Sequence, residues 1–228
     1  MASRLWRAAQ RDTGLILVLA MQIAVVFVVA PLAATGAASS GLTEMLRFGL
    51  AAATTLIIAR RMVVRAMVVA MFVATLLGTQ LPLYSEPRAI VTIVNVIATL
   101  AFDLTVASLV GAATFRPGKV TAARILGAVI LYLYAALIFA GLYRLLELIL
   151  PQSFSGLPLG RRSTFAGLLY FSLGTLTTAG AGPIAPIHPF VRSMAALEAV
   201  IGQLFPATLL ARLVTLHASH AGRPLERD

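Results

Sequence analysis

The chain has 228 residues, of which 60% are hydrophobic and 11% are charged, and its formal net charge is +10. Soluble domains carry about 25% charged residues, so this composition indicates an integral membrane protein without a sizeable soluble domain. Such a positive charge would suggest nucleic-acid binding in a soluble chain. Here the basic residues cluster between apolar stretches, which favours a role in membrane topology. The absence of cysteine excludes disulfides, thiolate catalysis and cysteine-based metal sites.

The first half of the chain contains four apolar stretches long enough to cross a bilayer as helices, which takes about 20 residues each. The expected spans are residues 14–34, 42–59, 62–81 and 89–115. The first is longer than the apolar core of a signal peptide, about 7–15 residues. We therefore expect a retained helix, with a cleaved signal peptide as the alternative. Residues 1–121 form the predicted N-terminal membrane domain.

The second half has a different pattern, in which two long apolar spans enclose a short one. A fifth span over residues 122–150 and a sixth over residues 190–217 flank a short apolar helix over residues 164–177. That helix is too short to cross a bilayer, and it leads into a glycine-rich segment. Non-helical backbone at membrane depth is tolerated only where it is buried in protein or lines a wet cavity. Residues 122–217 are therefore predicted to be a pore-like domain, followed by a short tail over residues 218–228.

The distribution of basic residues predicts the orientation of this all-α, six-span fold. Six spans place both termini on one side, and that side carries more Arg and Lys than the other. The positive-inside rule then places both termini in the cytoplasm and the protein in the cell (inner) membrane. The fourth span has no Arg or Lys at every third position, so we expect no conventional voltage sensor.

The segment from Tyr170 to Gly182 resembles the pore helix and selectivity filter of the tetrameric potassium-channel family, whose filter reads T-V-G-Y-G-D. Thr178, Gly180 and Gly182 match that motif, and the resemblance continues through the sixth span to about residue 214. In place of the family's Val, Tyr and Asp, the chain has the residues Ala179, Ala181 and Pro183. The resemblance covers roughly the last 100 residues.

The resemblance implies a homotetrameric, passive monovalent-cation channel without enzyme activity or an organic cofactor. Its permeant ion would be K⁺, or another monovalent cation such as Na⁺, held by backbone carbonyls of residues 178–182 and by the Thr178 hydroxyl. Gly180 and Gly182 can adopt positive φ without a Cβ penalty, which lets successive carbonyls point the same way. The partners implied are other copies of the chain and the lipid bilayer, with no nucleic acid and no soluble partner.

The departures from the family motif affect rigidity more than coordination. The family's tyrosine packs outward against pore-helix aromatics, and Ala181 cannot do so, although Tyr170 and Phe171 occupy the aromatic positions. Pro183 has no N–H and a fixed φ. We therefore expect a cation pore with weakened potassium selectivity or altered inactivation, or a pore-like protein that no longer conducts. Thr177 is expected to end the pore helix, so that its partial negative charge faces the cation path.

Two features of the sixth span are candidate supports for the pore. Gly202 and Pro206 lie four residues apart, and the proline removes the hydrogen bond to the Gly202 carbonyl. We expect a gating hinge there, with a static kink as the alternative. Glu198 lies early in this helix and is expected either to brace the filter, by bonding a hydroxyl or amide, or to be purely structural.

Other polar residues carry weaker hypotheses. Asp103 in the fourth span could pair with Arg47 in the second as a packing device. His188 lies just outside the filter and is expected to be solvated, with pH sensing as the alternative.

One other interpretation of the glycine-rich segment and three other interpretations of the whole chain remain open beside the channel. The glycine-rich segment could be a turn that packs two helices closely. A secondary transporter also has broken helices, but it favours paired interruptions, and only one is present here. An intramembrane enzyme would need a nucleophile–base pair or a metal cluster, and no H-E-x-x-H or G-x-S-x-G motif occurs. A regulatory subunit that assembles with other pore chains is the third alternative.

Overall fold

The computed structural model describes residues 15–35, 49, 88–115, 121–157, 161–180 and 182–221, which are mostly helical. Four of the described helices are long and apolar enough to cross a membrane. They are Leu15–Leu32, Thr92–Thr114, Ala123–Ile149 and Pro189–Ala211. The chain is therefore consistent with an all-α membrane protein, as its composition predicts. The predicted second and third spans lie outside the described residues, apart from Gly49.

The first described helix runs from residue 15 to residue 34 and changes its hydrogen-bond pattern near the middle. Val25–Val29 form a π-helical turn (η1), closed by the Ala30 N–H bonding to the Val25 carbonyl, and α2 (Ala30–Ala34) follows. Pro31 lies just after the π turn and has no N–H to continue the regular ladder. Single π turns of this kind commonly interrupt α-helices.

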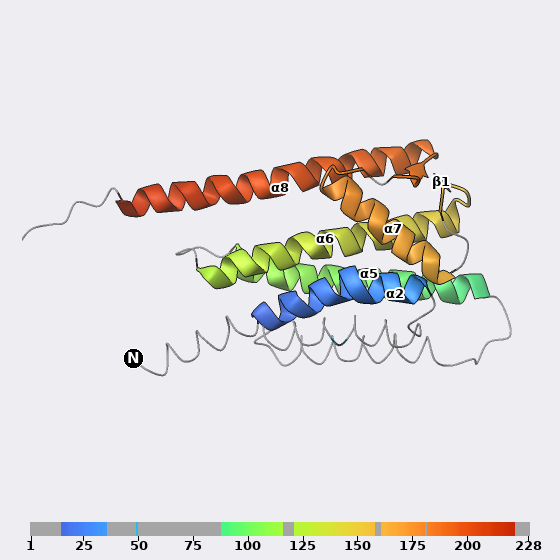
Figure 1. The fold of residues 1–228 in the computed structure, drawn as a ribbon, viewed down its shortest axis with the longest axis horizontal. Coiled ribbons are helices and arrows are strands. Elements are labelled where there is room, and N and C mark those ends of the chain that lie inside the picture. Colours follow the sequence, from blue (N-terminus) through green and yellow to red (C-terminus); the bar gives the residue numbers. More distant parts are fainter. Residues whose placement is uncertain are drawn as a thin grey trace, which may run out of the picture.

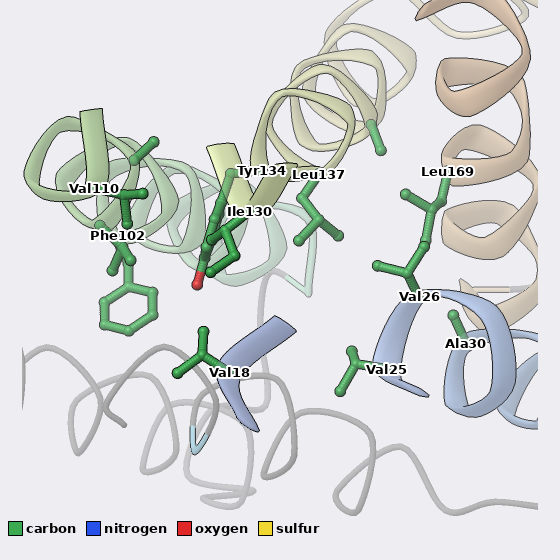
Figure 2. Close-up of a cluster of buried hydrophobic side chains, with 13 residues drawn as sticks. Val18, Val25, Val26, Ala30, Phe102, Val110, Ile130, Tyr134, Leu137 and Leu169 are labelled. Atoms are coloured by element: carbon green, nitrogen blue, oxygen red, sulfur yellow. The ribbon is translucent and has the colours of Figure 1, made fainter. Parts of the chain in front are cut away.

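This first helix packs into the same core as the helices of the C-terminal half. Figure 2 shows Val18, Val25 and Val26 facing side chains from the helices that follow. Val26 and Leu169, the latter on the short helix α7 (Arg161–Leu176), point toward one another. Within this chain, the first span therefore supports the short helix directly.

The remaining long helices are α5 (Arg88–Thr114), α6 (Ala122–Ile149) and α8 (Pro189–Ala221). In Figure 1, α5 and α6 run side by side, and α8 lies along the far side of α6. Helix α7 crosses this layer obliquely, and its C-terminal end meets α8 partway along its length. This crossing places the glycine-rich segment after α7 against the middle of α8.

A two-stranded antiparallel sheet joins the loop after α6 to the segment after the glycine-rich stretch. In it, β1 (Phe154–Ser155) pairs with β2 (Ala185–Pro186), with Phe154 opposite Pro186. Phe154 also enters a buried cluster with Tyr143 and Phe171, in which all three pairs of rings meet edge to face. The sheet and this cluster hold the two loops together at one end of the bundle.

The helix bounds differ from the predicted spans by a few residues. The short helix spans Arg161–Leu176, whereas the sequence predicted residues 164–177. The apolar pattern begins only after residue 163, but the first turn of a helix needs no apolar residues. Helix α8 extends to Ala221, so the first residues of the predicted tail are helical. Arg47, the proposed partner of Asp103, lies outside the described residues.

Candidate functional site

The C-terminal end of α7 has all of its last four carbonyl oxygens hydrogen-bonded. Such carbonyls have no partner within their own helix and must find one elsewhere. The pairs are Thr177 N to Leu173 O (3.0 Å), Gly180 N to Gly174 O (3.1 Å), Thr178 N to Thr175 O (3.0 Å) and Tyr132 Oη to Leu176 O (3.0 Å). Thr177 also donates its hydroxyl to Leu173 O at 2.7 Å. These bonds satisfy the C-terminal carbonyls of the short helix, whose partial negative charge is predicted to face the cation path.

The segment after α7 alternates in backbone handedness. Thr178, Gly180 and Gly182 have φ values of 58°, 85° and 55°. Positive φ is open to glycine, whereas an ordinary residue incurs about 1–2 kcal/mol there. The predicted positive φ of both glycines is confirmed. The positive φ of Thr178 was not predicted from the sequence. Positive φ at every second described residue is compatible with carbonyls that face one side, the arrangement predicted for a cation-coordinating strand.

The carbonyl oxygens of this segment differ from those of α7. Within the part of the chain that the structure describes, no hydrogen bond ends on the carbonyl of Thr178, Ala179 or Gly180. All three residues are exposed in the single chain. A Cβ built on Gly180 would meet nothing within 4 Å, so this glycine is required by its φ and not by lack of space. Ala181 lies outside the described residues.

The two aromatic residues predicted to support the filter, Tyr170 and Phe171, lie in different environments. The Tyr170 hydroxyl lies 3.5 Å from the position of a Cβ built on Gly182, so this exposed ring reaches the end of the candidate filter. Phe171 is buried and packs edge to face against Tyr143 and Phe154, with ring centroids 5.2 Å from each. Phe171 therefore supports the loop-holding aromatic cluster more directly than the filter.

Helix α8 meets the end of α7 at Gly202. A Cβ built on Gly202 would collide with the Leu176 carbonyl, whose carbon lies 2.7 Å from that position. Gly202 thus allows the two backbones to touch, a role that the hinge prediction did not include. Pro206 lies inside a helix that continues to Ala221.

The next residue, Gln203, contacts the candidate filter itself. Its side-chain Nε2 donates to the Thr178 hydroxyl oxygen at 2.9 Å, and that hydroxyl donates to the Thr177 carbonyl at 2.7 Å. Gln203 was not among the site residues predicted from the sequence. An uncharged polar residue in an apolar span, beside a glycine, was the available signal, because such a side chain needs a partner in the membrane.

Glu198 lies at the centre of a buried network that joins α6, α7 and α8. Glu198 and Tyr143 are both 0% exposed. The Tyr143 hydroxyl donates to Glu198 Oε2 at 2.6 Å, and the Ser172 hydroxyl lies in hydrogen-bond contact with Glu198 Oε1. Ser172 Oγ also lies 2.9 Å from the Ala136 carbonyl. The predicted bond of Glu198 to a hydroxyl is present, and the hydroxyl is on the short helix just before the candidate filter.

The number of hydrogens in this network constrains the charge of Glu198. Three oxygen pairs lie at hydrogen-bond distance, but the hydroxyls of Ser172 and Tyr143 supply only two hydrogens. All three pairs are hydrogen bonds only when the carboxyl brings a third. In that arrangement Glu198 donates to Ser172, Ser172 donates to Ala136 O, and Tyr143 donates to Glu198. A neutral carboxyl also avoids burying an uncompensated charge.

The C-terminal end of the candidate filter is held by the loop after α6. Gly156 has a φ of 72°, and a Cβ there would collide with the Pro183 carbonyl, whose carbon lies 2.8 Å away. Ile184, the next residue, is buried in the aromatic cluster. Pro183 therefore lies between the loop backbone and a buried anchor, which fixes this end without the side chain of an aspartate.

His188 has a structural role that was not predicted from the sequence. Its Nδ1 accepts a hydrogen bond from the Phe190 N–H at 3.2 Å, at the start of α8, and Pro189 occupies the first helical position. This arrangement satisfies one of the unpaired amides of a helix N-terminus, as Ser, Asp or Asn does at that position. The residue predicted to be solvated or to sense pH is thus a helix cap.

Comparison with known proteins gives one match. Residues 131–218 match the family model described as Ion channel, a range that contains most of α6, all of α7, the candidate filter and most of α8. No curated protein and no solved structure gives a significant match. The match supports an ion-channel family for this part of the chain, and with it passive conduction of ions through a membrane protein.

Proposed function

We propose that the protein is a homotetrameric, passive channel for monovalent cations, principally K⁺, with weakened discrimination against Na⁺. Residues 178–182 of each copy would line the path, and their backbone carbonyls, with the Thr178 hydroxyl, would replace the hydration shell of the ion. No enzyme chemistry, organic cofactor, nucleic acid or soluble partner enters this proposal. The protein would lie in the inner membrane, with both termini in the cytoplasm.

The observation that carries the proposal is the alternating backbone at Thr178, Gly180 and Gly182, within the region that matches an ion-channel family. A turn that merely packs two helices has no need for successive positive φ values or for unpaired carbonyls. The close helix contact predicted for such a turn occurs instead at Gly202, outside the segment. Close helix packing is thus a role of Gly202, and this supports the proposal that Gly180 and Gly182 belong to a cation-coordinating strand.

The fourfold assembly is supported by the exposure of α8. In an apolar 18-residue stretch of the span Pro189–Ala211, 11% of the residues are buried within the chain, compared with 56% in such a stretch of Ala123–Ile149. Leu197 and Val200 are exposed to 50% and 54%. One chain supplies one strand of carbonyls, so a closed ring of copies is needed to surround an ion, and the exposed side of α8 is available for contacts between those copies.

The proposal of weakened selectivity follows from how the strand is supported. Contacts of the described residues that restrain it include Gln203 at its inner end, the Gly180 N–H bonded to Gly174 in the middle, and Gly156 against Pro183 at its outer end. Residue 181 is alanine, so its own side chain cannot brace the strand as the family's tyrosine would. A strand that lacks this brace would change its width more easily.

The test is ion flux through purified protein in liposomes, with K⁺ and Na⁺ gradients compared. Gly180→Ala, which puts a Cβ on a residue with a φ of 85°, should reduce K⁺ flux strongly. Gly111→Ala is the matched control. That glycine lies inside α5, where a Cβ would make an ordinary 3.7 Å contact with Leu131, and flux should be retained.

The outcomes separate the alternatives. Faster K⁺ than Na⁺ flux, lost in Gly180→Ala alone, supports the proposal. Equal fluxes of both ions would support a pore but contradict its potassium preference. If correctly assembled tetramers carry no ions, and the variant that combines Ala181→Tyr with Pro183→Asp also carries none, conduction is refuted. That result would favour a regulatory or structural subunit. Flux that needs a second, counter-moving solute would favour a transporter.

A further inference from the structure

Thr178 stands in a conformation that its own residue type disfavours. Its φ is 58°, and a β-branched residue at positive φ is a genuine outlier. Such strain persists only when the surrounding structure over-determines it, and it tends to occur at functional sites. The contacts of Thr178 therefore show what keeps the inner end of the candidate filter in place.

Three hydrogen bonds restrain the residue. Its N–H donates to Thr175 O at 3.0 Å, and its hydroxyl donates to Thr177 O at 2.7 Å. Both of these partners belong to the same local stretch of chain. The third bond comes from Gln203 on α8, whose Nε2 lies 2.9 Å from the Thr178 hydroxyl oxygen. It is the one of the three that originates in another helix.

The direction of these bonds decides what the hydroxyl can offer to an ion. A hydroxyl has one hydrogen and two lone pairs. The hydrogen of Thr178 is directed to Thr177 O, and the Gln203 amide occupies one lone pair. The second lone pair is left for a cation, and no hydrogen points toward it. Gln203 thus helps to fix the hydroxyl as an oxygen ligand and not as a donor.

The neighbouring residue keeps Gln203 within reach. The backbone of Gly202 touches the Leu176 carbonyl, two residues before Thr178, and the site has no room for a Cβ. This contact sets the distance between α8 and the end of α7, and Figure 1 shows the two helices meeting there. A shift of α8 at this point would move the Gln203 amide relative to Thr178.

We propose that Gln203 is a positioning residue for the ion path, whose amide holds the Thr178 hydroxyl and backbone in their ion-coordinating arrangement. The inference rests on the proposed function for its effect on selectivity. Its structural part, that Gln203 maintains the positive φ of Thr178, is independent of conduction.

The variant that tests it is Gln203→Met, which keeps the length of the side chain and removes the N–H. Leu204→Met, on the same turn, is the matched control because the leucine side chain has no hydrogen-bonding group. Ratios of K⁺ to Na⁺ flux should fall in Gln203→Met, by roughly three- to fifteen-fold at most, a bound that assigns the whole free energy of one hydrogen bond between membrane helices to ion discrimination. The ratio in Leu204→Met should remain that of the unchanged protein.

A second measurement does not depend on flux. Solid-state NMR of the threonine-labelled protein in liposomes reports the backbone conformation of Thr178 through its Cα and Cβ shifts, with the signal assigned by its absence in Thr178→Ser. Those shifts should leave the positive-φ range in Gln203→Met and stay there in Leu204→Met. Should the unchanged protein carry no ions, the proposed function fails, while this comparison still decides the role of Gln203.

A double-mutant cycle separates the hydrogen bond from general packing. If the bond carries the effect, adding Gln203→Met to Thr178→Val changes the flux ratio and the tetramer stability no further, since the hydroxyl is already gone. Additive effects of the two substitutions would overturn the proposal, as would unaltered Thr178 shifts in Gln203→Met. Equal losses in Gln203→Met and Leu204→Met would also overturn it.

Discussion

Replacing Glu198 by glutamine and by leucine tests whether its carboxyl is neutral. Glutamine has the same size and supplies an N–H toward Ser172 and a carbonyl toward Tyr143. It therefore reproduces the bonds of a protonated glutamate. We expect Glu198→Gln to keep the unfolding free energy of the protein within about 1 kcal/mol of its original value, because every buried polar atom retains a partner.

Leucine removes both carboxyl oxygens, and Glu198→Leu should therefore destabilise the protein more than Glu198→Gln. Ser172 keeps its contact with the Ala136 carbonyl, but the Tyr143 hydroxyl, on a side chain that is 0% exposed, loses its acceptor. An unsatisfied buried group costs about 1–3 kcal/mol, and the lost bond to Ser172 adds about 0.6 kcal/mol. The total of roughly 2–4 kcal/mol corresponds to a fall in melting temperature of about 4–16 °C for a chain of this size.

The assay is thermal unfolding of the assembled protein in one detergent, followed by infrared spectroscopy of the unchanged protein. The carbonyl-stretch band of a protonated carboxylic acid should be present and should disappear in Glu198→Gln. The reasoning is refuted if Glu198→Gln lowers the melting temperature as much as Glu198→Leu, or if the band is absent. Either result would mean that Glu198 is ionised and that one of the three oxygen pairs is not a hydrogen bond.

The other predictions concern glycines and a helix cap. Gly202→Ala should destabilise the protein by about 1–3 kcal/mol through overpacking against α7, whereas Gly111→Ala should be neutral or stabilising; thermal unfolding of the pair measures the contrast. His188→Ala should cost about 0.5–2 kcal/mol and His188→Asn much less, because asparagine also caps helices; an equal loss in both would contradict the cap. Gly156→Ala should alter the K⁺ to Na⁺ flux ratio by displacing the outer end of the filter, and an unchanged ratio in assembled protein would show that the loop contact is unimportant.

The sequence predicted those elements whose signal lies within one segment. Long apolar stretches are sufficient to place spanning helices, and Gly180 could be assigned a positive φ because only glycine adopts it without strain. The strain at Thr178 could not be predicted, since it depends on the partners that hold the residue. The role of Gly202 was ambiguous, because a glycine in a helix looks the same whether the helix bends there or touches another backbone.

Most contacts between helices could not be predicted from the sequence. Membrane helices are apolar on most sides, so their hydrophobic pattern does not reveal which face meets which neighbour. The pairs formed by Gln203 with Thr178, and by Tyr132 with Leu176, depend on that orientation. A polar residue in a span signals that some partner exists, as it did for Glu198, but the identity of the partner requires the fold.

The exposure of α8 within one chain has a genetic consequence. In the fourfold assembly proposed above, each copy contributes a quarter of the path, so a single defective copy changes every ion site in that pore. If altered and unaltered chains are made in equal amounts and mix freely, about one assembly in sixteen contains only unaltered copies. A substitution that distorts the strand without preventing association, such as Gly180→Ala, should therefore act dominantly. A substitution that prevents the chain from folding keeps the altered chain out of the assemblies, and it should therefore be recessive.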